Sequence, residues 1–344
     1  MGSARAFIGS FTSAGGRGIT AAAVDPDSGA LTPLASTATV PDPSYLALTP
    51  GGDVLYAVSE TEDGAAAAFS VRGDVPELIA PPVPVQGAGP THLALAAGHL
   101  LTANYGSGSV SCLPLGPDAA PTPGHVLRHR GAGPDPDRQD GPHAHQVLPA
   151  PSGGWILTVD LGTDTVDVCT LTDGTLRVHG RAALRPGSGP RHLAFHPDGR
   201  TVHVLHELVP ALTVCDWDPA AGLLAPRAEI PVLDTVPTGD AYPSAVVVAP
   251  DGRFVWTATR GQDVISALAA DPDAADGSGL RLTATVDCGG HWPRDLALHP
   301  SGRFLYAANE RSGDVTWFTV DPDSGVPRRG GSVAAPAASC VVFG

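Results

Sequence analysis

Lysine is absent from the 344-residue sequence, and all 20 of its basic side chains are arginine. A Schiff-base mechanism, a phosphate-binding P-loop lysine and a lysine general base are therefore excluded. Any fixed positive charge in a functional site must come from arginine, whose planar guanidinium binds carboxylate and phosphate groups through paired hydrogen bonds.

Cysteine is scarce, and its five positions are far apart: Cys112, Cys169, Cys215, Cys288 and Cys340. No C-x-x-C pair occurs, so this spacing predicts buried, reduced thiols and not a disulfide framework or a zinc site. His143 and His145, two residues apart, could present both imidazoles on one face of a strand and so bind a metal ion, but the sequence shows no further ligand residues for such a site nearby. We therefore expect neither a metal nor a cofactor.

Long apolar runs and helical periodicity are also missing. No window of about 18 apolar residues suggests a membrane span, and the opening "MGSARAFIGSFTSAGG" lacks the apolar segment of a secretion signal. We therefore expect a cytoplasmic protein. The net charge of −15 excludes nucleic acid and anionic membranes as partners. An anionic substrate requires a site that concentrates arginines.

The sequence does contain an internal repeat. Each copy has a proline, two variable residues, an alternating apolar run, a turn with glycine, a second apolar run and a polar pair. A period of about 50 residues with short strands matches one four-stranded propeller blade. Full copies start at Pro43, Pro90, Pro142, Pro190, Pro243 and Pro293, and a truncated copy starts at Pro336.

The ends of the chain complete the count of seven. The last copy supplies one strand (339–343), and the N-terminus supplies the second and third strands of a blade (5–11 and 18–24). Joining them removes free sheet edges, which all-β proteins must otherwise protect. The sequence predicts an all-β, seven-bladed propeller of four-stranded antiparallel blades, as one domain spanning 1–344.

The repeat also predicts where a site lies. The start of the first strand and the end of the second strand lie on the same face of each blade, so seven blades gather both into rings at one mouth of the central channel. The ring of strand starts comprises Ser44, Thr91, His145, Arg191, Ser244, Arg294 and Ala337, with His143 just upstream. The ring of strand ends comprises Phe11, Glu60, Tyr105, Leu161, Glu207, Arg260 and Glu310.

These rings collect arginine, glutamate and histidine, a set that packing alone does not require. We expect a functional role for His143, His145, Arg191, Glu207 and Arg260. For the other polar positions the alternative is hydrogen bonding within the blades: Glu60, Arg294, Glu310 and the pairs Asn104–Tyr105 and Asp160–Leu161.

Four segments resemble the seven-bladed propeller lactonases, a family that includes propeller-type 6-phosphogluconolactonases and fungal carboxymuconate lactonizing enzymes. They are "GPDPDRQDGPHAH" (133–145), "GSGPRHLAFHPDGR" (187–200), "LTANYGSGSV" (101–110) and "WPRDLALHPSGRFLYAAN" (292–309). The resemblance covers essentially the whole chain. It implies a metal-free site that contains His143 or His145, Arg191, Glu207 and Arg260. Ser59, His206 and Thr259 stand where the family has asparagine, which points to a changed specificity.

Lactone hydrolysis assigns a catalytic role to each of these residues. Glu207 is expected to act as general base, His143 or His145 as the acid for the ring oxygen, and Arg191 and Arg260 as oxyanion donors. Substrate binding falls to Glu60, Asn104, Tyr105, Asp160, Trp292, Arg294 and Glu310, with Arg294 beside Trp292 expected to hold a phosphate or carboxylate.

Three function classes remain open from the sequence. The first is a hydrolase of 6-phosphogluconolactone or a related sugar lactone. The second is a lactonizing or cyclizing enzyme on an unsaturated diacid or a specialised metabolite, and the third is a non-catalytic binding propeller. The expected partner is a small lactone or anionic substrate, and the expected assembly is a monomer or weak homodimer.

Overall fold

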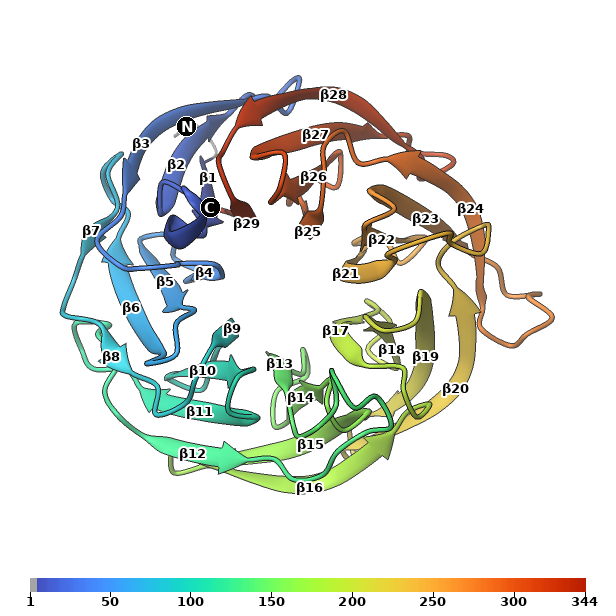
Figure 1. Ribbon diagram of the computed structural model, residues 1–344, viewed down its shortest axis with the longest axis horizontal. Helices are drawn as coiled ribbons and strands as arrows, with labels where there is room; N and C mark the ends of the chain where they lie inside the picture. Colours follow the sequence, from blue (N-terminus) through green and yellow to red (C-terminus); the bar gives the residue numbers. More distant parts are fainter. Residues whose placement is uncertain (1–4) are drawn as a thin grey trace.

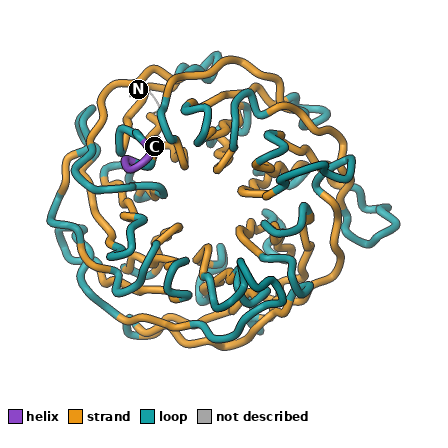
Figure 2. Tube along the Cα trace, in the orientation of Figure 1, coloured by secondary structure: helices purple, strands orange, loops and turns teal. Residues whose placement is uncertain are grey.

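Seven β-sheets stand around a central axis in the computed structural model, which describes residues 5–344 (Figure 1). Residues 1–4 of the predicted domain lie outside the described residues. Strands and loops make up almost the whole described chain (Figure 2), with one short 3₁₀ helix, η1 (Thr12–Ala14), near the N-terminus. Among residues 5–344, no helix has the length and apolar character that a membrane crossing requires.

We number the sheets as blades I to VII in chain order and name each from its innermost strand outward. Blade I contains β29 (Ala338–Phe343), β1 (Arg5–Ser10), β2 (Ile19–Val24) and β3 (Leu31–Thr37). Blade II contains β4 (Leu46–Leu48), β5 (Val54–Ser59), β6 (Ala65–Ser70) and an outer strand split into β7 (Glu77–Leu78) and β8 (Val83–Pro84). Blade III contains β9 (Pro90–Ala96), β10 (His99–Asn104), β11 (Ser109–Pro114) and β12 (His125–Arg128).

The remaining blades each have four antiparallel strands. Blade IV contains β13 (Ala144–Pro149), β14 (Ile156–Asp160), β15 (Thr165–Thr172) and β16 (Thr175–Ala183). Blade V contains β17 (Pro190–Phe195), β18 (Thr201–His206), β19 (Ala211–Asp218) and β20 (Leu223–Pro231). Blade VI contains β21 (Tyr242–Val248), β22 (Phe254–Arg260), β23 (Val264–Ala270) and β24 (Leu280–Asp287). Blade VII contains β25 (Pro293–Leu298), β26 (Phe304–Asn309), β27 (Asp314–Val320) and β28 (Pro327–Ala334).

The two ends of the chain meet in blade I. Strand β29 pairs with β1 in antiparallel register, and the backbone N–H groups of Arg5 and Gly344 each bond to the other's carbonyl. The N and C labels accordingly lie close together in Figure 1. The predicted propeller, closed by its C-terminal strand, is therefore confirmed. The cysteines are free and buried, as their spacing predicted.

Neighbouring blades are tied by a repeated contact. An aromatic side chain on or beside the second strand of one blade donates a hydrogen bond to a carbonyl in the turn between the third and fourth strands of the next. The turn must approach closely: a Cβ at Gly325, whose φ is +71°, would lie 2.4 Å from Phe254. The four donor–acceptor pairs are Tyr56–Ala119, Trp155–Pro219, Trp256–Gly325 and Tyr306–Gly29, at 2.7–2.8 Å.

Removing the contact that closes the ring should weaken the fold. Tyr306→Phe leaves the buried carbonyl of Gly29 without its 2.7 Å donor, so we expect a loss of about 1–3 kcal/mol in the free energy of unfolding. Urea unfolding measures it, with Tyr242→Phe on half-buried Tyr242 as the matched control. Unchanged stability in Tyr306→Phe would show that the contact contributes nothing to closure.

A β-bulge at the start of the innermost strand recurs in six blades and positions the site. At each bulge two residues oppose one on the partner strand, which frees the extra side chain from the ladder and re-aims it. The bulged residues are Thr91, His145, Arg191, Ser244, Arg294 and Ser339. In blade I the ring position belongs to Ser339 and not to Ala337, because the bulge of β29 lies three residues after the repeat proline Pro336, whereas in blade V it lies one residue after Pro190.

Candidate active site

The bulged residues face one another across the axis and connect the blades. Thr91 donates to the carbonyl of His145 (3.2 Å), Ser244 to that of Pro293 (2.6 Å), and Ser339 to that of Ser44 (2.7 Å). These small hydroxyl side chains thus lock one inner strand onto the next. The larger side chains at the same level form the ionic clusters described below.

The predicted ring of strand ends lies at the same level. Six members of this ring donate a backbone hydrogen bond to a carbonyl of their own blade, two residues before the bulged residue or, in blade II, before Ser44. Arg260 instead pairs with Tyr242 in the strand ladder. The bonded pairs are Phe11–Ala337, Glu60–Asp42, Tyr105–Gly89, Leu161–His143, Glu207–Gly189 and Glu310–Trp292. The two predicted rings therefore do meet at one end of the axis, with Ser339 in place of Ala337.

Glu207 lies at the centre of three arginines. Its Oε2 is 2.9 Å from Nε of Arg191 and 2.8 Å from Nη2 of Arg260, and its Oε1 is 2.5 Å from Nη2 of Arg138. Burial alone would raise the pKa of Glu207, but the charges of Arg260, Arg191 and Arg138 outweigh it and hold the pKa well below the ordinary value. Glu207 is therefore a carboxylate with both oxygens covered.

Arg191 and Arg260 are fixed by the strands that carry them. Arg191 also donates to the carbonyl of Ser244, and burial with the nearby charge of Arg260 lowers its pKa to about 9, so it remains protonated at neutral pH. Arg260 donates from Nε to the carbonyl of Tyr242 (3.1 Å). Its Nη2 is close to Glu207, yet no N–H of that nitrogen makes a hydrogen bond with any described residue. A buried, unsatisfied donor of this kind suits a developing oxyanion.

Arg138 was not singled out from the sequence. It belongs to the loop of residues 129–143, whose ends are held by one carboxylate: Asp160 accepts from Nδ1 of His129 (2.6 Å) and from the backbone N–H of His143 (2.9 Å). Inside the loop, buried Gln139 donates to Leu161 and Asp164. The loop contains most of the segment "GPDPDRQDGPHAH" noted in the sequence, and this compact folding explains why it requires polar residues and prolines.

A second ionic cluster lies in the same ring. Arg294 is 3.4 Å from Glu60 and 3.1 Å from Glu310, and its guanidinium stacks over the ring of Phe11 at 4.7 Å. Burial, opposed by the charge of Arg294 and a hydrogen bond from Ser44, raises the pKa of Glu60 above its ordinary value. Two carboxylates thus surround one cation here, whereas three cations surround one carboxylate at Glu207.

Trp292 stands at the rim between blades VI and VII. Its backbone is left-handed, with φ of 66°, and its N–H bonds to Asp263. The guanidinium carbon of Arg311 lies 3.3 Å from the centre of the indole ring, and that of Arg260 lies 5.6 Å from it. Trp292 therefore connects an exposed arginine to one of the arginines at Glu207.

The two histidines of the "GPHAH" motif occupy different environments. His143 stacks on Tyr105, with ring centres 4.5 Å apart, and its Nε2 lies 3.4 Å from the exposed carboxylate of Asp140. His145 is buried, and burial together with the charges of Arg191, Arg294 and Arg260 holds its pKa well below the ordinary value. His145 is therefore a neutral imidazole, and only His143 has access to solvent protons.

Asn104 and Asp160 lie at the strand ends but are bonded inside the blades. The amide of Asn104 bonds to Thr102, Ser109 and Ser111, and Asp160 holds the loop described above. His206, at the same strand position in blade V, bonds to Thr213 at 2.7 Å. The structure brings the remaining predicted residues together at one end of the axis: His143, His145, Arg191, Glu207, Arg260, Glu60, Tyr105, Trp292, Arg294 and Glu310.

Beneath this level, buried polar side chains and half-buried Tyr45 fill the axis. Tyr45, His92, His192 and Asp295 lie here, and His192 accepts from Nη1 of Arg191 at 3.3 Å. A cavity of about 10 Å³ leaves room for roughly one water molecule. Burial raises the pKa of Asp295 to about 7 despite nearby arginines. Among residues 5–344 no three histidine, cysteine or acidic side chains form a group able to hold a metal ion.

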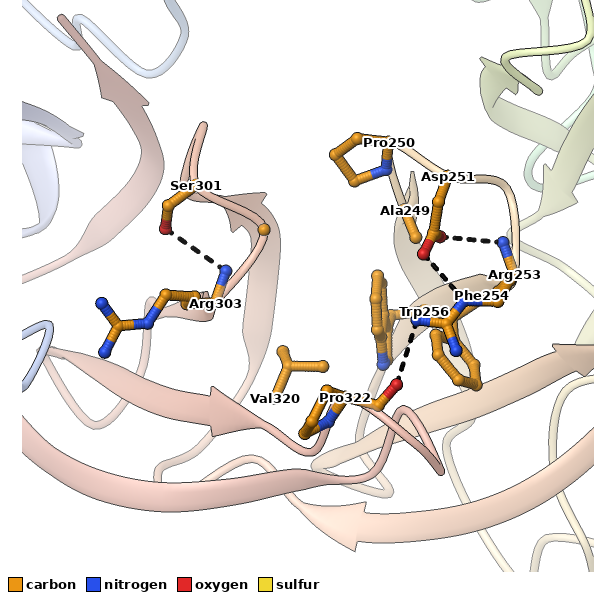
Figure 3. Close-up of a pocket in the computed structure, with 11 residues that line it drawn as sticks. Ala249, Pro250, Asp251, Arg253, Phe254, Trp256, Ser301, Arg303, Val320 and Pro322 are labelled. Carbon is orange, nitrogen blue, oxygen red and sulfur yellow. Dashed lines mark hydrogen bonds and ion pairs between the residues drawn. The ribbon is translucent and has the colours of Figure 1, made fainter.

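A larger cavity of about 280 Å³ lies between the hairpin turns of blades VI and VII, at the other end of the inner strands (Figure 3). Its two arginines are already engaged: Arg253 bonds to Asp251 and to the carbonyl of Pro322, and Arg303 bonds to the carbonyls of Pro26 and Asp27. Its floor includes Trp256, which forms one of the contacts between blades. The charged cluster around Glu207 is therefore the better candidate for chemistry.

Comparison with known proteins agrees with this geometry. The family model described as "Lactonase, 7-bladed beta-propeller" matches residues 5–343. The 6-phosphogluconolactonase of Bacillus subtilis is 32% identical over 268 residues, which cover 76% of each chain. The structure of the periplasmic gluconolactonase of Pseudomonas aeruginosa superposes with a TM-score of 0.91 at 28% identity, and that of a Lactobacillus plantarum protein with 0.92 at 28%; both cover 99% of each chain. Fold and family match agree, and the chain belongs to the seven-bladed β-propeller lactonase family.

Proposed function

We propose that this protein is a metal-independent lactonase that opens 6-phosphoglucono-δ-lactone or a closely related phosphorylated sugar lactone. The observation that carries the proposal is the cluster of Glu207 with Arg138, Arg191 and Arg260, which supplies a carboxylate base and oxyanion donors within one buried site. The excess of arginine there favours an anionic lactone, although the whole chain is acidic. Relatives named 6-phosphogluconolactonase support the same substrate.

The residues support hydrolysis by addition and elimination. Glu207 takes a proton from water while the water oxygen bonds to the lactone carbonyl carbon. Arg260, whose Nη2 is ion-paired with Glu207 but makes no aligned hydrogen bond to a described residue, stabilises the oxyanion together with Arg191. His143, the histidine with access to solvent, gives a proton to the ring oxygen as its bond to the carbonyl carbon breaks. The product is the open hydroxy acid.

The second cluster suits the hydroxyl groups of the sugar. Glu60 and Glu310 are acceptors, and the charge of Arg294 is already balanced by these two glutamates. A free anion placed there would meet two carboxylates. We therefore assign sugar hydroxyls to Glu60, Arg294 and Glu310, and the anionic group to the arginines around Glu207. Three guanidinium groups would also repel a divalent cation from that carboxylate, which supports catalysis without a metal.

Proton release in a pH-stat tests the proposal directly. The wild-type protein should open 6-phosphogluconolactone faster than unphosphorylated gluconolactone, after correction for spontaneous opening, and a chelator should leave both rates unchanged. Loss of activity with the chelator, restored by a divalent metal, would overturn metal independence. No acceleration of either lactone would reject the hydrolase and favour a lactonizing enzyme of the same family.

A further inference from the structure

Both oxygens of the Glu207 carboxylate are engaged by arginines, and its side chain is only 6% exposed. Oε2 contacts Arg191 and Arg260, and Oε1 contacts Arg138 at 2.5 Å. A general base must come within hydrogen-bond distance of the proton that it removes. Withdrawal of one arginine would open this buried carboxylate to a water molecule and make it more basic.

Arg138 is the arginine that can leave. Arg191 and Arg260 project from strands β17 and β22, are 2% and 7% exposed, and also bond to backbone carbonyls of blade VI. The Arg138 side chain comes from a loop, is 34% exposed, and otherwise contacts only the hydroxyl of Tyr105, at 3.4 Å, among the described residues. Its displacement leaves no backbone carbonyl without a donor.

The loop itself can stay in place while the Arg138 side chain moves. Asp160 holds both of its ends, and neighbouring Gln139 is buried and bonded to Leu161 and Asp164. Because neighbouring Gln139 is anchored, the loop backbone is fixed at this point. The long Arg138 side chain can still rotate over a short distance. A displacement confined to one exposed side chain is fast compared with turnover.

We propose that the phosphate of the substrate draws Arg138 away from Glu207, so that binding of the anion exposes the Oε1 oxygen as the catalytic base. Arg138 is then a specificity-determining residue that couples phosphate recognition to the chemical step. A lactone without phosphate leaves Arg138 on Glu207 and reacts slowly even when it is bound. This inference rests on the proposed lactonase function and assigns its preference for phosphate to one residue.

The coupling has a pH signature. The charged and titratable groups that face Glu207 are Arg138 from the loop, Arg191 and His192 from β17, Arg260 from β22 and Arg294 from β25. Their charges lower the pKa of Glu207, so loss of one cation raises it. In the wild-type protein the acid limb of kcat for the phosphorylated lactone should lie at higher pH than that of kcat/KM. In Arg138→Gln that cation is already missing, so the acid limbs of kcat and of kcat/KM should lie at the same pH.

The decisive experiment compares both lactones in the wild type, Arg138→Gln, Arg138→Lys and the control Arg130→Gln, which changes an exposed arginine of the same loop. Arg138→Gln should lose about 10- to 100-fold in kcat/KM for the phosphorylated lactone, the value of one charged hydrogen bond. It should gain activity on gluconolactone, because Oε1 of Glu207 is then uncovered without phosphate, and Arg138→Lys should recover part of the loss. Added inorganic phosphate should accelerate gluconolactone opening by the wild type and not by Arg138→Gln.

The outcomes separate this inference from the proposed function. Equal losses on both lactones, with no activation of the wild type by phosphate and no movement of the acid limbs, would overturn the role of Arg138 and leave the lactonase intact. A wild-type protein that opens neither lactone would reject the proposed function and the inference with it.

Discussion

Replacing Glu207 by glutamine should lower kcat for lactone opening by about 10²- to 10⁴-fold, the range that a positioned general base contributes. Glutamine keeps the shape of the side chain and can still accept hydrogen bonds from the arginines, but it cannot remove a proton from water. Initial rates in the pH-stat measure the loss, with both lactones at saturating concentration.

The same substitution should also destabilise the protein. Arg191 and Arg260 are buried, and Glu207 is the carboxylate that balances both of them. Removing one partner of a buried ion pair costs about 3–5 kcal/mol, because the other charge is left uncompensated. Urea unfolding tests this, and Glu229→Gln, which breaks a surface pair with Arg185, should change stability by less than about 1 kcal/mol. Full turnover in correctly folded Glu207→Gln would exclude Glu207 as the base.

Asp295→Asn should make the protein more stable in alkaline solution and leave it little changed in acid. Burial raises the pKa of Asp295 from 3.8 to about 7 in the folded protein, against the opposing hydrogen bond from Val341 and the charge of Arg191. The folded state therefore holds this proton more tightly than the unfolded chain does, and stability falls as pH rises from about 4 through about 7.

The size of the effect follows from the shift. A rise of about three pKa units corresponds to a destabilisation of at most about 4 kcal/mol. This destabilisation is complete when the pH exceeds the pKa of Asp295 in the folded protein. Asparagine carries no charge and can still accept the N–H of Val341, 3.3 Å away in the wild type. Urea unfolding at about pH 5 and about pH 8 should show a clearly larger gain in stability at the higher value, with Asp323→Asn on an exposed aspartate as control. Equal destabilisation at both values would show that Asp295 is ionised and needed as an anion.

The periodicity of the sequence predicted the architecture because each blade repeats the same strand and turn signals. It also placed Glu60, Glu207, Arg260 and Glu310 at one level, since these residues follow the same strand in successive repeats. The position of the bulge in β29 was not visible in this pattern: Ser339, two residues further along the chain, takes the place expected for Ala337. Periodicity locates ladder positions, whereas a bulge depends on local backbone conformation.

Arg138 escaped prediction for a different reason. It lies in a loop outside the repeat, and its distance from Glu207 depends on how that loop folds around Gln139 and Asp160. Asn104 and Asp160 lie at the same level as the predicted ring of strand ends, yet their side chains form hydrogen bonds within the blades. The direction of a side chain at a strand end depends on which neighbours complete its hydrogen bonds, and no spacing rule contains that information.

The repeated bulge also bears on how such enzymes can evolve. A bulged residue takes no part in strand pairing within its blade, so a change of its side chain alters the axis without changing the register of that blade's ladder. In this chain, three of the bulge positions carry His145, Arg191 and Arg294, and others carry small hydroxyl residues. A mutation at one bulge position can therefore change which molecule is accepted while the strand register of the blade is kept. Directed evolution toward other lactones should begin with combinatorial libraries at these positions.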